Sequence, residues 1–112
     1  FQAAQEKGPG FWAIGVDSDQ YELAPENTLS SMMKQVDVAV FETIKAAHEG
    51  SFQAGTTVFG LKEGGVGLAP TTSNNTPQEV IDQVNALGDQ IIAGEFTVPA
   101  TEEELENFTP PQ

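Results

Sequence analysis

The strongest restriction on the fold comes from a continuous apolar run between two polar breaks. Residues 11–16 (Phe-Trp-Ala-Ile-Gly-Val) follow a Gly-Pro-Gly sequence that closes a short helical segment, and they end abruptly at the polar residues 17–20. Continuous rather than alternating apolarity is typical of a strand buried on both faces, as in a parallel sheet. A helix end, a tight loop, a buried strand and a polar loop together predict an α/β fold.

Further strands and helices are predicted from the rest of the chain. Gly50 and Gly94 follow the two longest helical patterns, and a glycine after the last turn is a common helix stop. Residues 35–49 are apolar nearly all round in their first turns, which is typical of a helix with several neighbours. The predicted elements are strands at 28–33 and 56–61, a turn at 62–65, an extended piece at 66–69, and helices at 35–49 and 76–94.

The last predicted helix carries the most detailed local signal. Thr76 is suited to the N-cap and Pro77 to the first helical position, and Glu79 completes a capping box. Gly88 weakens the helix by ~1 kcal/mol relative to Ala, so a break at that point stays open. The buried stripe of this helix is predicted to contain Val80, Ile81, Val84, Leu87 and Ile91.

The C-terminal residues and the aromatic side chains complete the structural predictions. Residues 96–99 are expected to be extended, and the acidic residues 101–112 are expected to form a frayed tail. The aromatic residues form no stripe, and we expect five of them in the core. These five are Trp12, Phe41, Phe52, Phe59 and Phe96.

The charge of the chain excludes one class of function. Four Lys, no Arg and seventeen acidic residues give a formal net charge of -13. Nucleic acids and anionic membrane surfaces require clustered cations, so we expect no nucleic-acid partner. The chain contains no Cys, which excludes disulfides and thiolate metal sites.

Polar residues follow the first two predicted strands at their carboxyl ends. Asp17, Ser18, Asp19 and Gln20 come directly after the first strand, and Lys34 ends the second. In open α/β sheets, ligands bind beyond the carboxyl ends of the strands. A carboxylate there accepts two hydrogen bonds from a vicinal diol, which makes Asp17 a candidate receptor for sugar hydroxyls.

Simpler interpretations of the same residues stay open. Asp17 and Asp19 are equally suited to capping the loop, and Lys34 to an ordinary solvated position. Two acids at i and i+2 also suggest a hydrolase or divalent-metal site, but no His or third ligand lies near them in sequence. The chain lacks Gly-x-Ser-x-Gly, and the Gly-rich residues 60–67 match no phosphate-binding spacing. We therefore expect no catalytic residue, metal or cofactor, and no enzyme activity.

Three stretches, taken in order, resemble a known family. They are residues 12–20 (Trp-Ala-Ile-Gly-Val-Asp-Ser-Asp-Gln), 28–37 (Thr-Leu-Ser-Ser-Met-Met-Lys-Gln-Val-Asp) and 59–68 (Phe-Gly-Leu-Lys-Glu-Gly-Gly-Val-Gly-Leu). Together with the final helix and the Phe-Thr-Val-Pro sequence after it, they resemble the basic-membrane-protein family, the purine nucleoside receptor A-like solute-binding lipoproteins. The Gly-Val-Asp-x-Asp-Gln string is the most specific part of the likeness, which runs over nearly the whole chain.

The resemblance implies a type I periplasmic-binding-protein fold, in which two Rossmann-like, parallel-sheet lobes close on a ligand. It also implies that this chain is the C-terminal part of that fold. Members of the family bind nucleosides, often purine nucleosides, and deliver them to the permease of an ABC importer. By resemblance, Asp17 takes ribose hydroxyls and Lys34 is directed at the same sugar. The alternative function is a ligand-sensing or surface-antigen lipoprotein of the same fold without transport. The implied location is extracytoplasmic, at the cell surface or in the periplasm, with a lipid anchor that is not in this chain.

The resemblance also divides the chain between the two lobes. Residues 1–34 fall in the second lobe, residues 35–65 cross the hinge and enter the first lobe, and residues 66–112 return to the second. The sequence opens on Phe1 inside a helical segment, so we expect a longer parent protein. The apolar face of residues 35–49 is then expected to be covered by another copy, by an exchanged element or by the rest of the parent chain.

Overall fold

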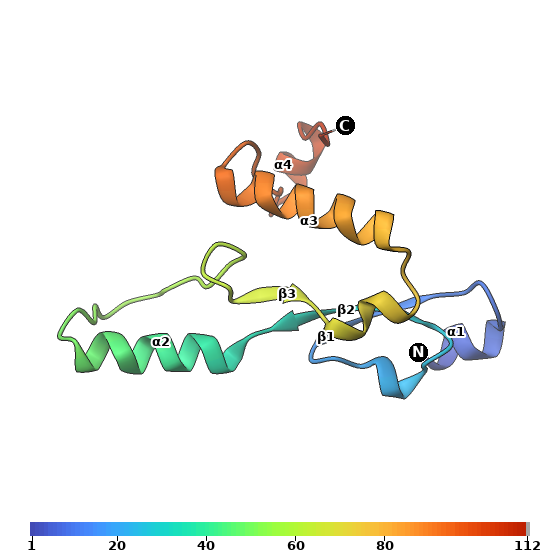
Figure 1. Cartoon of the computed structure of the whole chain (residues 1–112). Helices are drawn as coiled ribbons and strands as arrows, with labels where there is room; N and C mark the ends of the chain where they lie inside the picture. The colour runs from blue at the N-terminus through green and yellow to red at the C-terminus, as the bar shows by residue number, and fades with distance from the viewer. Residues whose placement is uncertain (112) are drawn as a thin grey trace.

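The computed structural model describes residues 1–111 and shows an open α/β arrangement (Figure 1). A three-stranded sheet lies at the centre, one long helix extends from its end, and a second long helix lies over one side. The elements in chain order are α1 (Gln2–Lys7), β1 (Ala13–Asp17), the 3₁₀ turn η1 (Tyr21–Leu23), β2 (Thr28–Lys34), α2 (Val36–His48), β3 (Val66–Leu68), the 3₁₀ turn η2 (Pro70–Asn74), α3 (Gln78–Ala93) and α4 (Glu102–Glu106).

The sheet has the order β1-β2-β3, with β2 in the centre. β1 pairs with β2 in parallel, as the sequence predicted, whereas β3 runs antiparallel to β2. Asp17 lies opposite Met33, and Val66 lies opposite Lys34. The end of β1, the end of β2 and the start of β3 therefore meet at one edge of the sheet, where the sequence predicted a ligand.

The prediction that β1 is buried on both faces is wrong in this structure. Ile14 is 62% exposed and Val16 is 47% exposed, and within the strand only Gly15 is buried. Neither long helix packs closely against β1 within the described residues, and Ile14 faces α3 only across a groove. Three of the aromatic residues expected in the core are also exposed: Trp12, Phe41 and Phe52.

The buried side chains of the described residues are few and mostly polar. Four of them lie along or beside β2: Asn27, Thr28, Ser31 and Thr72. Asn27 Nδ2 donates to three carbonyl oxygens of α1 and the loop after it, at 2.9, 3.3 and 3.4 Å. Thr72 Oγ1 and Ser30 Oγ share a 2.9 Å hydrogen bond, which ties η2 to β2. Each such bond contributes about 1 kcal/mol, so hydrogen bonds rather than apolar burial hold this region.

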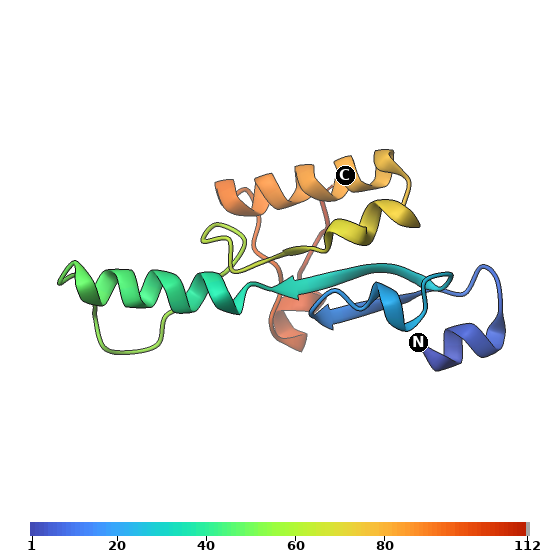
Figure 2. The ribbon, with the colours of Figure 1, turned by 60° about the horizontal axis from the view of Figure 1, so that its bottom comes forward.

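The helix predicted at residues 35–49 is confirmed as α2, which projects away from the sheet (Figure 1). No strand or other helix of residues 1–111 packs along it, and Val36, Phe41 and Ile44 are each 63% exposed. Residues 51–60 return from the far end of α2 toward β3 as an irregular chain (Figure 2). The strand predicted at 56–61 is therefore wrong, because an extended segment needs a partner strand and none lies beside it in the described structure.

α3 ends where the sequence predicted, at Gly94, which is left-handed with φ 76°. Gly88 does not interrupt the helix. The predicted capping box is wrong, because Thr76 Oγ1 donates to the Leu29 carbonyl of β2 at 2.7 Å instead of capping the helix. The predicted apolar stripe faces the sheet across grooves of about 730 and 240 Å³. α3 therefore stands over the sheet without filling the space between them.

The acidic C-terminal residues contain a short helix, α4, where a frayed tail was expected. Thr101 Oγ1 accepts from Glu104 N at 3.2 Å, and Glu104 Oε2 accepts from Thr101 N at 3.2 Å. This reciprocal pair is a capping box, which stabilises the first turn of a helix. The prediction of a frayed tail is therefore wrong for residues 102–106, and Gln112 lies outside the described residues.

The molecule is elongated, with extents of 53 × 35 × 26 Å and a radius of gyration of 17.0 Å. A compact domain of this length has a radius of gyration of about 13 Å. The difference follows from α2, along which no other helix or strand of the described residues packs, and from α3, which stands off the sheet. Within residues 1–111, no helix has the length and apolarity needed to cross a membrane.

Candidate functional site

The two residues predicted to bind a ligand meet at the carboxyl edge of the sheet. Asp17 is the last residue of β1 and Lys34 the last residue of β2, and parallel pairing brings the two ends together. Lys34 Nζ lies 2.7 Å from Asp17 Oδ1. The Lys34 side chain is 55% exposed and that of Asp17 67%, and an ion pair this exposed contributes about 0–1 kcal/mol to stability. Both groups are therefore accessible, and little stability is lost if they turn to a ligand.

The backbone of Asp17 is unusual. Its φ of 79° is in the left-handed region, and among residues 1–111 it is the only residue other than glycine with a positive φ. Such a conformation costs about 1–3 kcal/mol, although Asp adopts it more readily than most residues. Strained backbone conformations cluster at active sites and ligand-binding sites, although Asp also adopts this one in ordinary turns.

Gln20 and Ser31 hold the loop that comes after Asp17. Gln20 Oε1 accepts a hydrogen bond from Val16 N at 3.2 Å, and Gln20 N donates to Ser31 Oγ at 3.1 Å. Ser31 is completely buried in the central strand. Neither residue was assigned a role from the sequence. Gly15 in the interior of β1 was an available signal, because glycine inside a strand often marks the close approach of another group.

Asp19 has a structural role in the same loop. Its Oδ1 accepts from Tyr21 N at 3.1 Å, which closes a short turn before η1. Thr71 Oγ1, on η2, lies 2.7 and 2.8 Å from the two carboxylate oxygens. The loop-capping interpretation that was left open for both acids therefore describes Asp19, whereas the carboxylate of Asp17 faces Lys34.

The geometry gives no support to a metal or two-carboxylate hydrolase site. Within the part of the chain that the structure describes, no three His, Asp or Glu side chains gather as metal ligands would. The carboxylate of Asp19 is occupied by Thr71, and that of Asp17 lies beside a cation. The two acids therefore have different partners in this structure.

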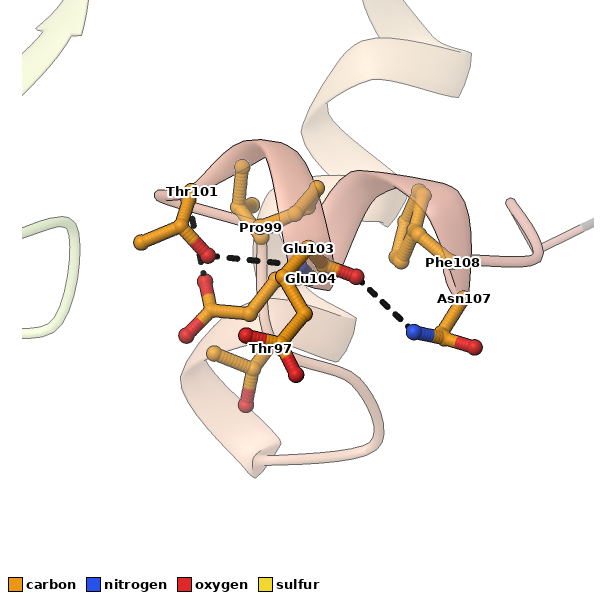
Figure 3. Close-up of a pocket in the computed structure, with 8 residues that line it drawn as sticks. Thr97, Pro99, Thr101, Glu103, Glu104, Asn107 and Phe108 are labelled. Atoms are coloured by element: carbon orange, nitrogen blue, oxygen red, sulfur yellow. Dashed lines mark hydrogen bonds between the residues drawn. The ribbon is translucent and has the colours of Figure 1, made fainter.

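A second recess lies at the C-terminal end, between residues 97–99 and α4 (Figure 3). Its volume is about 750 Å³. Several of its polar groups are already engaged, because Thr101 and Glu104 form the capping box and Asn107 Nδ2 donates to the Glu103 carbonyl at 2.8 Å. These bonds belong to the local structure of α4, and the Asp17–Lys34 edge is the stronger candidate site.

Comparison with known proteins identifies the family. A family model described as ABC transporter substrate-binding protein PnrA-like matches residues 1–102. The chain belongs to this family. The predicted relationship to basic membrane proteins is thereby confirmed, and it extends over most of the sequence.

Two of the similar relatives are basic membrane proteins of Borreliella species. Basic membrane protein D of Borreliella burgdorferi (strain JD1) is 36% identical over 110 residues, and Basic membrane protein A of Borreliella afzelii is 36% identical over 109 residues. Each alignment covers 96% of this chain, but only 32% and 33% of the relatives. The chain thus spans about a third of the length of the curated relatives that it matches.

A solved structure confirms the fold class. The solute-binding protein of an ABC transporter system from Aeropyrum pernix K1 is similar with a TM-score of 0.64 and 26% sequence identity. The match covers 95% of this chain and 38% of that protein. The chain therefore has the α/β fold of ABC-transporter solute-binding proteins and contains part of it, as the resemblance implied.

Proposed function

We propose that this chain supplies part of the ligand site of an extracytoplasmic receptor, which captures a nucleoside between two lobes and delivers it to an ABC importer. Membership of the substrate-binding family supports the general class. The observation that supports the ligand site is the Asp17–Lys34 pair, 2.7 Å apart at the carboxyl edge of the sheet. This is the edge at which α/β folds bind their ligands.

The chemistry of the pair suits the ribose of a nucleoside. A carboxylate is an acceptor with two oxygens, and an ammonium group carries three donor hydrogens. Neighbouring ribose hydroxyls donate to Asp17, and a hydroxyl oxygen accepts from Lys34. The two charges compensate each other, so the site favours a neutral ligand. The preference for a purine base rests on the family resemblance alone.

The proposed activity is binding without chemical conversion and without a cofactor. Hydrolysis requires a nucleophile together with a neighbouring general acid or base, and the group beside the Asp17 carboxylate is the Lys34 ammonium. Steady conversion of inosine to hypoxanthine by the pure protein, lost on Asp17→Asn substitution, is the result that would contradict this part of the proposal.

We further assign residues 1–34 and 66–112 to the second lobe and residues 35–65 to the first. The bare apolar face of α2 supports this division, because a first lobe would cover it. The native protein is proposed to be held at the membrane by a lipid outside this chain and to contact the permease of its importer.

Calorimetry on the intact gene product tests the ligand assignment. Adenosine is expected to bind more tightly than 2′-deoxyadenosine or adenine, because losing a hydrogen bond to a charged group costs about 1.5–3 kcal/mol, roughly 10–100-fold in affinity. Glu22→Gln, which removes an exposed acid on η1, serves as the control and leaves all three affinities unchanged. Equal affinity for adenosine and adenine would contradict the ribose assignment.

The alternative, a sensor or surface antigen of the same fold, differs in the fate of the bound ligand. Uptake of radiolabelled adenosine by cells with and without the gene separates the two functions. Transport predicts that uptake falls when the gene is deleted, whereas a sensor leaves uptake unchanged although the pure protein binds the nucleoside.

A further inference from the structure

We propose that Gln20 is a positioning residue for the ligand site and that it holds Asp17 in the conformation in which the carboxylate faces Lys34. The inference rests on the proposed function, because it takes Asp17 and Lys34 as the groups that contact the ligand. Gln20 itself makes no contact with the ligand in this proposal. It acts through the backbone on either side of Asp17.

The left-handed backbone conformation of Asp17 must be held by contacts of the residues around it. With φ at 79°, the residue turns the chain sharply at the end of β1. Most L-residues avoid this region, and Asp, which adopts it more readily, still adopts it at a cost in free energy unless its surroundings favour it. The contact of the Asp17 side chain with Lys34 is too exposed to impose the turn, because exposed ion pairs are weak.

Gln20 forms hydrogen bonds both with the strand before the turn and with the central strand beside it. Its side-chain oxygen accepts from Val16 N, the residue before Asp17, at 3.2 Å. Its backbone N–H donates to Ser31 Oγ at 3.1 Å, and its carbonyl accepts from Leu23 N at 3.1 Å. The carbonyl of Ser31 in turn accepts from Ala69 N at 2.8 Å, so the anchor belongs to the sheet rather than to a mobile loop. The segment from Val16 to Gln20 is thus closed against the central strand.

Gly15 provides the space that this closure needs. A Cβ atom at Gly15 would lie 2.7 Å from Gln20 Oε1 and 2.5 Å from Ser31 Oγ, both closer than such atoms approach. The glycine therefore allows the Gln20 side chain to lie against β1 and reach Val16 N. Asp19 anchors the loop separately to Thr71 on η2, and the backbone N–H of Gln20 still donates to Ser31, so loss of the Gln20 side chain removes only the bond to Val16 N and leaves both of these tethers intact.

The test uses the intact gene product with three substitutions. Gln20→Leu keeps the size of the side chain but removes the acceptor, Gln20→Glu restores an acceptor for Val16 N, and Gln53→Leu is a control at an exposed Gln away from the sheet. Calorimetry gives the affinities for adenosine and 2′-deoxyadenosine, and a crystal structure of each variant gives the conformation of residue 17.

Gln20→Leu is expected to reduce the preference for adenosine over 2′-deoxyadenosine by about tenfold, because a misaligned carboxylate loses much of its hydrogen bonding to the sugar hydroxyls. Its crystal structure is expected to show residue 17 outside the left-handed region or the Asp17–Lys34 distance beyond about 4 Å, the limit for an ion pair. Gln20→Glu restores the preference, and Gln53→Leu leaves it unchanged.

The failure of this inference is distinct from the failure of the proposed function. If the native protein prefers neither nucleoside, the ribose assignment fails, and the Gln20→Leu crystal structure still decides the role of Gln20. An unchanged Asp17 conformation in that variant overturns the inference. Equal weakening of both ligands with unchanged Asp17 geometry would mean that Gln20 only stabilises the fold, and would overturn it as well.

Discussion

The loop after β1 and the helix after β2 leave the same edge of the sheet but are held in opposite ways. Residues 17–20 are fixed by hydrogen bonds to β1, β2 and η2, through Gln20, Ser31 and Thr71. α2 leaves the neighbouring strand with Val36, Phe41 and Ile44 exposed, and no element of the described chain packs along it.

The loop of residues 17–20 and α2 differ in where the contacts that fix them come from. The loop is specified by polar partners that lie within the described residues, and each of its bonds contributes about 1 kcal/mol. The position of α2 depends on apolar burial, which needs a large complementary surface. The Asp17–Lys34 edge is therefore expected to keep its geometry when α2 is disturbed. Substitutions in each of the two regions can test this expectation.

The largest effect is expected for the 112-residue chain studied by itself. Leaving three apolar side chains of α2 exposed lowers the free energy of unfolding by on the order of 5 kcal/mol, which is comparable to the whole stability of a small domain. We expect the isolated chain to associate with itself, and the triple substitution Val40→Ser, Phe41→Ser, Ile44→Ser to reduce that association. Analytical ultracentrifugation that finds a stable, cooperatively folding monomer of the unsubstituted chain would refute this, and the assignment of elements to lobes would need revision.

A smaller but specific effect is expected at the ligand edge. Asp17→Asn keeps the shape and tolerates the left-handed conformation, but it removes the charge. In the intact gene product we expect affinity for adenosine to fall roughly 10–100-fold, because a hydrogen bond to a charged group is lost. The melting temperature is expected to stay within about 2 °C, since the side chain is exposed. A large loss of melting temperature would instead favour a structural cap at Asp17.

Gly15→Ala tests the close packing beneath the loop. The new methyl group would meet Ser31 and Gln20 at 2.5 and 2.7 Å, and overpacking of this kind costs about 1–3 kcal/mol. Gly88→Ala is the matched control, because nothing lies within 4 Å of a Cβ added there and alanine favours the helix by about 1 kcal/mol. Urea denaturation of the intact gene product is expected to show opposite changes in unfolding free energy for the two variants. Equal changes would contradict the close packing at Gly15.

The smallest effect concerns the stability contributed by the ion pair itself. A double-mutant cycle of Asp17→Asn and Lys34→Met is expected to give a coupling energy below about 1 kcal/mol in unfolding, because both side chains are largely exposed. The same cycle measured on adenosine affinity is expected to give a larger coupling. A coupling above about 2 kcal/mol in unfolding alone would show that the pair serves the fold rather than the ligand.

Much of the fold could be predicted because its signals are local. The apolar run before Asp17, the helical patterns before Gly50 and Gly94, and the parallel pairing of the first two strands all depend on residues close in sequence. The meeting of Asp17 and Lys34 could be predicted because parallel strands end at the same edge. These predictions needed no knowledge of distant contacts.

Most of the errors share a physical cause, which is a contact made or missing far away in sequence, whereas the frayed tail is a local error, because Thr101 and Glu104 form a capping box. Thr76 donates to Leu29, 47 residues away, rather than capping α3. Residues 56–61 have strand-like composition but no neighbouring strand among the described residues to pair with. β1 is apolar on both faces yet exposed, because no described helix packs closely against it. Local patterns do not encode such partners.

The most direct test of the proposed ligand site is a crystal structure of the intact gene product with adenosine bound. We predict that an Asp17 carboxylate oxygen accepts from a ribose hydroxyl within about 3 Å, that Lys34 Nζ donates to the same sugar, and that residue 17 keeps its left-handed φ. A structure in which the ribose lies elsewhere, and Asp17 and Lys34 contact only each other and solvent, would contradict it.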